Sequence, residues 1–310
     1  MSKESNENLN ATVRSGLIMQ SIGGFYYVKE EISDRIYECR GRGILRAKGI
    51  TPTVGDRCKI AVPNDLSGTN LSTVNEILSR KNILVRPAVA NLDKLFVVIS
   101  SCKPRPNLLV TDRLIAAAEY DDIEPVLVLT KLDLGDISEI ESIYKSSGFK
   151  VLVADYDNPD GLPAVRDEMR GCLSAFAGNS GVGKSTLLNA LCPQLSQETS
   201  ETSEKLGRGR HTTRSVQLFC IDTDTYIADT PGFSSFDGEL GVRIPADKLE
   251  LCYREFGSCL GMCKFVSCAH IKDKGCAVLE ALERGEIQRS RHESYAVMHE
   301  ESRQKKEWER

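Results

Sequence analysis

Hydrophobic and polar positions follow three different patterns along this chain. Up to residue 82, apolar runs of strand length, such as 24–28 and 57–62, are separated by glycine-containing turns, and no helical period persists. Between 83 and 242, strand-like apolar runs alternate with segments of helical spacing. Beyond 243, cysteines crowd together and a helical pattern follows from 278 onward. The patterns predict a multidomain protein.

The first pattern predicts a small β-barrel over residues 14–82, after a polar stretch at 1–13 that we expect to be disordered. Its size and strand spacing fit a five-stranded barrel of oligonucleotide-binding type (OB-fold), and an SH3-like barrel would give much the same pattern. The second pattern predicts an α/β domain over 83–242. The third predicts a mostly helical domain with a metal site over 243–310.

Composition narrows the class of protein. The 310 residues exceed one ordinary domain, and 41% hydrophobic with 27% charged residues is a typical globular composition. No apolar stretch approaches the roughly 20 residues that span a bilayer, so we expect no membrane partner. Six of the eleven cysteines are scattered singly, mostly among apolar neighbours. This pattern is typical of reduced thiols and predicts a cytoplasmic protein.

Charge in the barrel region differs from that of the whole chain. The net charge of −4 does not indicate a nucleic-acid partner, but residues 14–81 carry 11 Lys and Arg against 7 Asp and Glu, a net of +4. One predicted loop is either a solvated loop or a contact to RNA phosphates. Its basic residues are Arg40, Arg42, Arg46 and Lys48. The aromatic residues that serve as either stacking partners for bases or core residues are Phe25, Tyr26 and Tyr27.

The strongest chemical signal is a complete GxxxxGK[ST] phosphate loop, which follows the strand predicted by the apolar run 173–177 and opens a helix. Its residues are Gly178, Asn179, Ser180, Gly181, Val182, Gly183, Lys184 and Ser185, and the helix continues with Thr186. Inward-turned backbone N–H groups and the helix N-terminus make such a loop bind the phosphates of a nucleoside triphosphate. We expect Lys184 to reach the β- and γ-phosphates and the Ser185 hydroxyl to bind Mg²⁺.

Thr130, Lys131 and Asp133 belong to a variant of the guanine-reading [NT]KxD motif at the end of a predicted strand. A carboxylate at Asp133 accepts hydrogen bonds from both guanine N1–H and N2–H₂, and adenine presents no such pair of donors. The aliphatic stem of Lys131 would lie across the base and ribose. At the end of the strand predicted over 151–154, the backbone of Ala154 is the candidate contact to guanine O6.

Further nucleotide-binding residues follow the phosphate loop. Asp229 and Gly232 form a DxxG motif, in which Asp229 would hold Mg²⁺ through water and the Gly232 N–H would contact the γ-phosphate. Thr213, rather than the threonine before it, is the predicted switch residue whose hydroxyl binds Mg²⁺ in the triphosphate state. Phe233 replaces the glutamine that orients water in many GTPases. His211 is therefore the candidate for positioning water, and a solvated loop histidine is the alternative.

The order of these motifs is guanine motif, phosphate loop, switch and DxxG, whereas in an ordinary GTPase the phosphate loop comes first and the guanine motif late. We interpret the order as a circular permutation, which preserves the contacts because the loops meet in space. One consequence is that nucleotide-dependent motion at 232–245 would act directly on the C-terminal domain.

Four residues near the C-terminus suit a metal. Cys263, Cys268, His270 and Cys276 supply three thiolates and one imidazole within fourteen residues, a set suited to one tetrahedral structural Zn²⁺. The alternative is disulfides or reduced core thiols. We favour zinc because a short segment with little helix needs a bound metal or a similar cross-link to stabilise its fold.

Together these residues resemble the ribosome-small-subunit-dependent GTPase A family, bacterial circularly permuted GTPases of late small-subunit assembly. The resemblance covers nearly the whole chain, and Thr130 for the commoner Asn and Val153 for Ser are its departures. The matching segments are Arg86-Pro87-x2-Ala90-Asn91-x-Asp93, Thr130-Lys131-Leu132-Asp133, the phosphate loop, Gly209-Arg210-His211-Thr212-Thr213, Asp229-Thr230-Pro231-Gly232-Phe233 and the cysteine–histidine set.

The resemblance implies an N-terminal oligonucleotide-binding barrel, a permuted GTPase domain and a zinc domain. It also implies an enzyme that hydrolyses GTP to GDP and phosphate with stimulation by the small ribosomal subunit, whose ribosomal RNA the two flanking domains contact. The alternative is a nucleotide-gated assembly factor for which hydrolysis is incidental. We expect a monomer that binds GTP or GDP.

Overall fold

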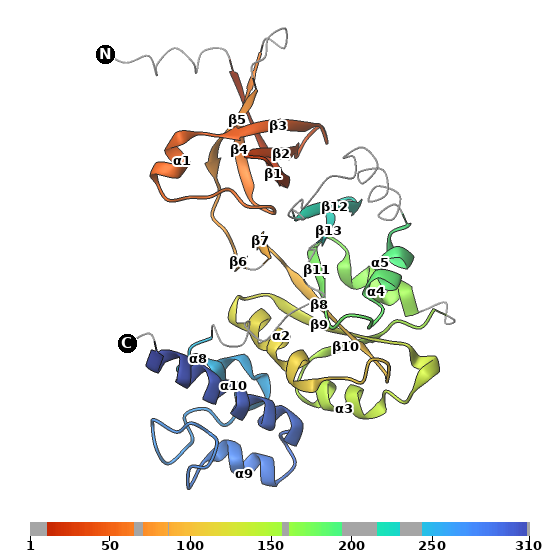
Figure 1. Ribbon diagram of the computed structural model, residues 1–310, viewed down its shortest axis with the longest axis vertical. Coiled ribbons are helices and arrows are strands. Elements are labelled where there is room, and N and C mark those ends of the chain that lie inside the picture. Colours follow the sequence, from red (N-terminus) through yellow and green to blue (C-terminus); the bar gives the residue numbers. More distant parts are fainter. Residues whose placement is uncertain are drawn as a thin grey trace. The chain divides into compact units, whose positions relative to one another are not determined.

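The computed structural model describes residues 11–64, 71–85, 87–156, 161–193, 216–229 and 244–308 (Figure 1). Contacts between these residues divide the chain into two compact units. The first unit comprises the described residues of 1–92, 171–173 and 210–231, and the second those of 93–170, 174–209 and 232–310. Each unit is therefore assembled from segments that are separate in the sequence.

Five strands of the first unit close into a barrel. They are β1 (Ala11–Ile22), β2 (Phe25–Glu30), β3 (Ile36–Gly41), β4 (Arg57–Pro63) and β5 (Ser72–Ile77). The order is β1-β2-β3-β5-β4 with β4 returning to β1, and the β3–β5 pair is parallel while the others are antiparallel. Inward side chains such as Ile18, Val28 and Ile60 are fully buried. The closed five-stranded barrel confirms the predicted OB-type fold.

Two expectations for the barrel are wrong. Strand β1 begins at Ala11, which pairs with Pro63 of β4, so residues 11–13 belong to the barrel and not to a disordered stretch. The polar start of β1 is held by this backbone pairing, which needs no apolar side chains. The basic residues also do not share one loop. Arg40 lies in β3, whereas Arg46 lies in the short helix α1 (Gly43–Ala47), whose Leu45 is buried in the barrel core.

Two hairpins complete the first unit. One consists of β12 (Gln217–Asp222) and β13 (Thr225–Asp229), and Gln20 of β1 pairs with Gln217. The other consists of β6 (Ile83–Val85) and β7 (Ala88–Ala90). A Cβ at Gly55, where φ is 89°, would lie 2.1 Å from the carbonyl oxygen of Ala90, so only glycine fits there. The close approach fixes β7 against the barrel, and the first unit extends beyond residue 82 to Leu92.

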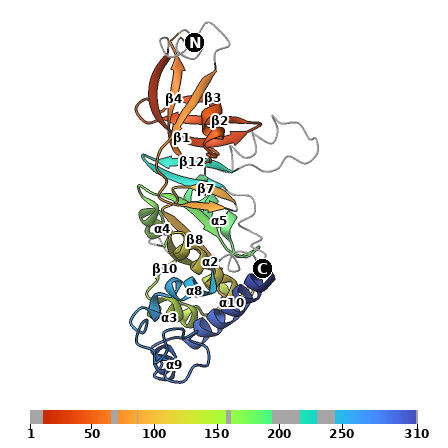
Figure 2. The same cartoon turned by 90° about the vertical axis from the view of Figure 1, so that its left-hand side faces the viewer.

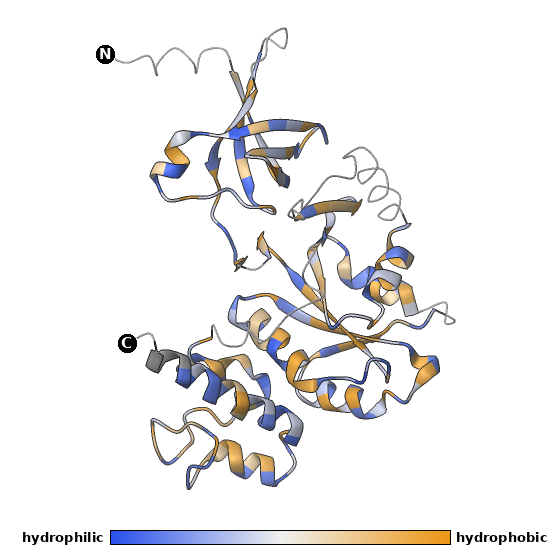
Figure 3. Cartoon of the chain, in the orientation of Figure 1, coloured by the Kyte–Doolittle hydropathy of each residue, from blue (hydrophilic) through white to orange (hydrophobic). Residues whose placement is uncertain are grey.

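The second unit contains a parallel sheet with the strand order β10-β9-β8-β11. The strands are β8 (Lys94–Ser100), β9 (Glu124–Thr130), β10 (Lys150–Val153) and β11 (Leu173–Ala177). The helices that alternate with them are α2 (Leu108–Tyr120), α3 (Ser138–Ser146), α4 (Gly161–Met169) and α5 (Lys184–Leu191). Figure 3 shows β8 and β9 as mostly hydrophobic ribbons, as expected for strands that are buried on both faces. The predicted α/β pattern is thereby confirmed.

The C-terminal part of the second unit is mostly helical and irregular (Figure 2). Its elements are α8 (Ala246–Leu249), the 3₁₀ turns η4 (Glu250–Cys252) and η5 (Arg254–Phe256), α9 (Ala277–Glu283) and α10 (Arg289–Trp308). Tyr253, Phe256 and Tyr295 pack their rings together at centroid distances of 4.9–5.2 Å and are almost fully buried. These rings form the core of the C-terminal part. No helix among the described residues is long and apolar enough to cross a membrane.

Two buried or half-buried arginines fasten this C-terminal part to α2. Arg291 of α10 donates hydrogen bonds to Asp112 of α2 at 2.6 Å and to Glu255 at 2.7 Å. The side chains of Arg291 and Asp112 are 1% and 0% exposed. Arg254 donates to Glu119, near the end of α2, at 2.7 Å. Because removing one partner of a buried pair is costly, these contacts make α2 the main attachment point of the C-terminal part.

Candidate functional site

The phosphate loop joins the end of β11 to the start of α5. Gly178, Gly181 and Gly183 have φ values of 144°, 79° and 99°, a region of backbone conformation that side chains disfavour. A Cβ at Gly178 would lie 2.3 Å from the carbonyl oxygen of Val98 in β8. The three glycines are therefore required by geometry, and they give the loop the turned backbone that an anion-binding nest needs.

Lys184 is held inside this loop. Its Nζ donates hydrogen bonds to the carbonyl oxygens of Gly178 at 2.6 Å and Asn179 at 2.9 Å. Burial lowers the pKa of Lys184 to about 8. Ser180, Ser185 and Thr186 are exposed around it, so their hydroxyls are accessible to a ligand. The loop thus presents the ammonium group of Lys184 and the hydroxyls of these three residues at the N-terminus of α5.

The guanine motif is tied directly to the phosphate loop. Thr130, the last residue of β9, donates its hydroxyl to the carbonyl oxygen of Val182 at 2.6 Å. Lys131 follows with a φ of 58° and donates from Nζ to the carbonyl oxygen of Gly181 at 2.6 Å. Asp133 lies in the 3₁₀ turn η3 (Leu132–Leu134) and is exposed. A threonine at position 130, the departure from the commoner Asn, therefore still bonds the phosphate loop.

A small pocket lies beside the phosphate loop, between the loop and the start of α2. Its lining includes Pro104, Asn107, Thr111, Gly178, Asn179 and Val182. Asn107 caps α2 by accepting a hydrogen bond from the Val110 N–H at 3.2 Å. The first turn of α2 is thus adjacent to the loop, and the buried Asp112 follows this turn directly.

Several predicted residues are placed elsewhere or cannot be placed. The Ala154 N–H donates to the carbonyl oxygen of Leu129 at 2.8 Å, so this amide is already used by the neighbouring strand and we do not keep it as a guanine contact. Asp229 is the last residue of β13 and belongs to the first unit. Thr213, His211 and Gly232 lie outside the described residues.

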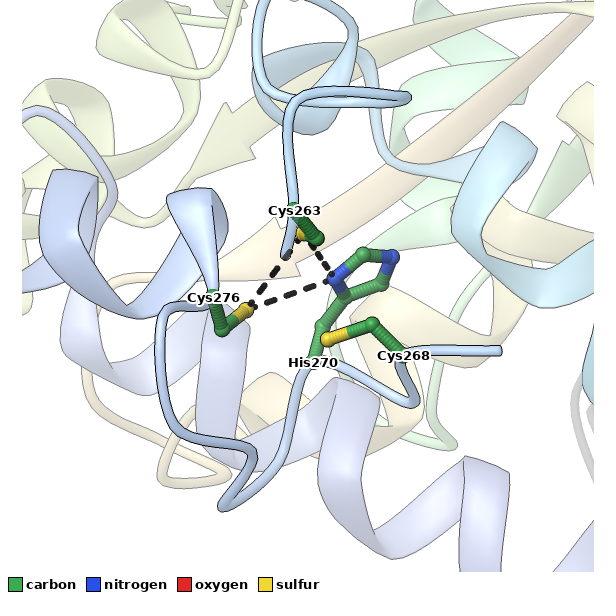
Figure 4. A group of neighbouring side chains, drawn as sticks. All are labelled: Cys263, Cys268, His270 and Cys276. Atoms are coloured by element: carbon green, nitrogen blue, oxygen red, sulfur yellow. Dashed lines mark hydrogen bonds between the residues drawn. The ribbon is translucent and has the colours of Figure 1, made fainter. Parts of the chain in front are cut away.

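The cysteine–histidine set converges on one point (Figure 4). The ligand atoms of Cys263, Cys268, His270 and Cys276 lie within 4.8 Å of one another. His270 Nδ1 is 3.5 Å from the Cys263 Sγ and 3.4 Å from the Cys276 Sγ, and those two sulfurs are 3.9 Å apart. Zn–S bonds of about 2.3 Å and Zn–N bonds of about 2.0 Å in a tetrahedron give N–S distances of about 3.5 Å and S–S distances of about 3.8 Å. The observed spacing of Cys263, His270 and Cys276 fits zinc, and the Cys268 Sγ lies within 4.8 Å of the other three ligand atoms.

Comparison with known proteins decides the family. The RsgA GTPase family model matches residues 77–239, and the model of the RsgA N-terminal domain matches residues 15–69. The chain belongs to the RsgA GTPase family. Among curated RsgA proteins, the small ribosomal subunit biogenesis GTPase of Ruminiclostridium cellulolyticum is 39% identical over 286 residues, 92% of each chain. The protein of that name from Halalkalibacterium halodurans is 41% identical over 292 residues, 92% of this chain and 96% of its own.

Solved structures support the same assignment. The crystal structure of YloQ, titled a circularly permuted GTPase, has a TM-score of 0.78 at 32% identity and covers 96% of this chain and 98% of its own. YjeQ from Thermotoga maritima has a TM-score of 0.77 at 30% identity, with coverage of 94% and 99%. The RsgA assignment and the permuted GTPase fold confirm the resemblance stated from the sequence, and they identify a GTP-hydrolysing enzyme.

Two residues that contact predicted site residues were not predicted from the sequence. Ser101 donates its hydroxyl to the Lys131 carbonyl oxygen, and Glu250 accepts a hydrogen bond from His270. Neither residue lies in a motif, because each acts through a contact between segments distant in sequence. No local signal could have found them.

Proposed function

We propose that this chain, as a cytoplasmic monomer, hydrolyses GTP at the phosphate loop and guanine motif and acts in late maturation of the small ribosomal subunit. The hydrogen bonds from Thr130 and Lys131 to the carbonyls of Val182 and Gly181 carry the proposal. They join the segment that selects guanine to the segment that holds phosphates. A molecule with a guanine at one end and phosphates at the other fits this arrangement.

The proposed reaction is in-line attack of water on the γ-phosphate of GTP. Mg²⁺, when bound, supplies positive charge to the β- and γ-phosphate oxygens. Lys184 contributes a second positive charge to the same oxygens, from a position fixed before the reaction. The residues assigned to Mg²⁺ are Ser185, Thr213 and Asp229, and those assigned to the γ-phosphate and the attacking water are Gly232 and His211.

Asp133 selects guanine in this proposal. Its carboxylate is exposed at the turn that follows β9, one residue beyond Leu132 and two beyond Lys131. Replacing Asp133 by Asn exchanges one acceptor oxygen for a donor and should shift preference from guanine to xanthine nucleotides. Equal ATP binding before and after the substitution would contradict the assignment of guanine.

The outer face of the barrel supports a contact to ribosomal RNA. Phe25 of β2 and Arg40 of β3 are register partners, and the Arg40 guanidinium lies 4.7 Å from the Phe25 ring centroid. Tyr26, the next residue, packs against the barrel core instead. A cation over an aromatic ring at the surface of an OB-type barrel is suited to stacking with a base beside a phosphate. The curated RsgA relatives are named for small-subunit biogenesis.

The cysteine–histidine set holds one structural zinc ion in this proposal. The convergence of three thiol groups and one imidazole within 4.8 Å, with Cys263, His270 and Cys276 at distances close to those of a tetrahedral site, supports it. Zinc would hold together a loop whose described residues contain little regular structure. Metal analysis of the purified chain should give one zinc per chain.

Single-turnover GTP hydrolysis, with and without purified small ribosomal subunits, tests the enzymatic proposal. We expect the small subunit to raise the rate. No stimulation, combined with tighter association of the subunit in the presence of a non-hydrolysable GTP analogue, would favour a nucleotide-gated assembly factor instead. The same association measured with GDP is the control.

A further inference from the structure

The two ring nitrogens of His270 have different surroundings. Nδ1 faces the sulfurs of Cys263 and Cys276, and the other ring nitrogen is directed away from them (Figure 4). That second nitrogen, Nε2, lies 2.8 Å from Oε2 of Glu250. The His270 side chain is 4% exposed, so this carboxylate is its partner on the side away from the cluster.

We propose that Glu250 is a positioning residue of the zinc site. Glu250 accepts a hydrogen bond from Nε2–H and so fixes the imidazole tautomer whose Nδ1 lone pair faces the metal position. The same hydrogen bond makes Nδ1 a stronger metal ligand. Glu250 does not touch the metal position and acts only through His270. This inference rests on the proposed zinc site.

The backbone around His270 is held independently of Glu250. His270 has a φ of 57°, an unusual conformation for a residue other than glycine. Its carbonyl oxygen accepts a hydrogen bond from Nε2 of His292 at 2.7 Å, and the Ala269 carbonyl oxygen accepts one from the Tyr295 hydroxyl at 3.2 Å. Both donors belong to α10. Helix α10 thus holds the backbone of the loop, and Glu250 holds the orientation of the His270 ring.

The hydrogen bond between His270 and Glu250 also connects the cysteine–histidine cluster to α2. Glu250 begins η4, the turn that packs against α2, while α10 reaches α2 through the ion pair of Arg291 with Asp112. Both elements that hold His270 are therefore attached to the same helix, α2. A zinc ion in the cluster would hold η4 and α10 together through His270.

A simpler interpretation gives Glu250 only a structural role, as the hydrogen-bond partner of His270 in a chain without metal. The two readings differ in a measurable way. A purely structural hydrogen bond contributes equally whether or not zinc is present, whereas a positioning residue contributes to zinc affinity itself.

The test uses the full-length chain and zinc alone. Zinc affinity is measured by competition with a chromophoric chelator for the wild type, Glu250→Ala and Glu250→Gln. We expect Glu250→Ala to bind zinc about 10–100-fold more weakly, as is usual for loss of such a partner of a metal-bound histidine. Glu250→Gln should lose less, because its amide oxygen still accepts the Nε2–H bond. Glu283→Gln, an exposed glutamate in α9 of the same part, is the matched control and should not change affinity.

Three outcomes would overturn the proposal or its basis separately. Zinc affinity of Glu250→Ala within twofold of wild type would remove the role of Glu250 while leaving the zinc site intact. An equal drop in melting temperature for metal-free and zinc-loaded Glu250→Ala, with unchanged affinity, would establish the structural reading in its place. A wild-type chain that binds no zinc would instead remove the zinc proposal.

Discussion

The two candidate sites of the second unit are built in different ways. At the phosphate loop, backbone groups and Lys184 come from eight consecutive residues, and three glycines fix the shape of the loop. At the cysteine–histidine cluster, the four side chains come from a longer loop that is held from outside. Hydrogen bonds with η4 and α10 determine its backbone and the orientation of His270.

Because of this difference, we expect some substitutions to change ligand binding and others to change the stability of the fold. Substitution of Lys184 in the phosphate loop removes a group that faces the ligand and leaves the hydrophobic core untouched. Substitutions in the attachment of α10 to α2 remove buried charges that hold the C-terminal part in place. The former should change nucleotide chemistry with little change in unfolding, and the latter should do the opposite.

The largest expected effect is on stability and comes from Arg291→Met. The substitution leaves Asp112 buried without its cationic partner, and breaking a buried ion pair in this way costs about 3–5 kcal/mol. Urea denaturation followed by circular dichroism measures the change in free energy of unfolding. Arg303→Met is the matched control on the same helix, since Arg303 is 62% exposed in its pair with Glu300 and should change stability by at most about 1 kcal/mol. Equal effects of the two variants would contradict the assignment of α2 as the attachment point.

Lys184→Ala should affect catalysis instead. Loss of one preorganised positive group at the γ-phosphate lowers rates by about 10²–10³-fold. The melting temperature should stay close to that of the wild type, because the lysine makes hydrogen bonds only to loop carbonyls among the described residues. Single-turnover GTP hydrolysis gives the rate, and Lys145→Ala on the exposed face of α3 is the control. A large loss of stability in Lys184→Ala would remove the distinction between the two sites.

The sequence predicts the residues that lie in local motifs far better than the residues that act through distant contacts. The phosphate loop follows from glycine spacing, and β11 spans the same residues, 173–177, as the apolar run that predicted it. The four cysteine and histidine ligands also come from one short segment. Glu250 and Arg291 could not be predicted, since their roles depend on how η4, α10 and α2 pack. The start of β1 and the helix α1 were missed because backbone pairing and one buried leucine, rather than a periodic pattern, determine them.

Thr130→Val tests one hydrogen bond within the nucleotide site. It removes the hydroxyl that Thr130 donates to Val182 and leaves a buried carbonyl without that donor, at a cost of about 1–3 kcal/mol. Because the bond joins the guanine motif to the phosphate loop, we expect weaker GDP binding, by about tenfold, measured by isothermal titration calorimetry. Thr130→Ser keeps the hydroxyl and should bind GDP like the wild type. GDP binding by Thr130→Val equal to that of the wild type would contradict the role of this hydrogen bond.

The smallest effect expected is a pH dependence of nucleotide binding. Burial sets the pKa of Lys184 to about 8 in the nucleotide-free loop, and adjacent phosphates must raise it in the complex. Between these two pKa values the complex holds one more proton than the free loop, so affinity falls as pH rises through 8, by at most about tenfold per pH unit. Well below pH 8 this group contributes no dependence. GDP binding is titrated at pH values from about 7.0 to about 8.5, which span this pKa. Repeating the titrations in buffers of different ionisation enthalpy gives both the change of GDP affinity with pH and the number of protons taken up on binding. Lys184→Arg, whose guanidinium stays charged, should bind with no such slope, and a slope that persists would assign the titration to another group.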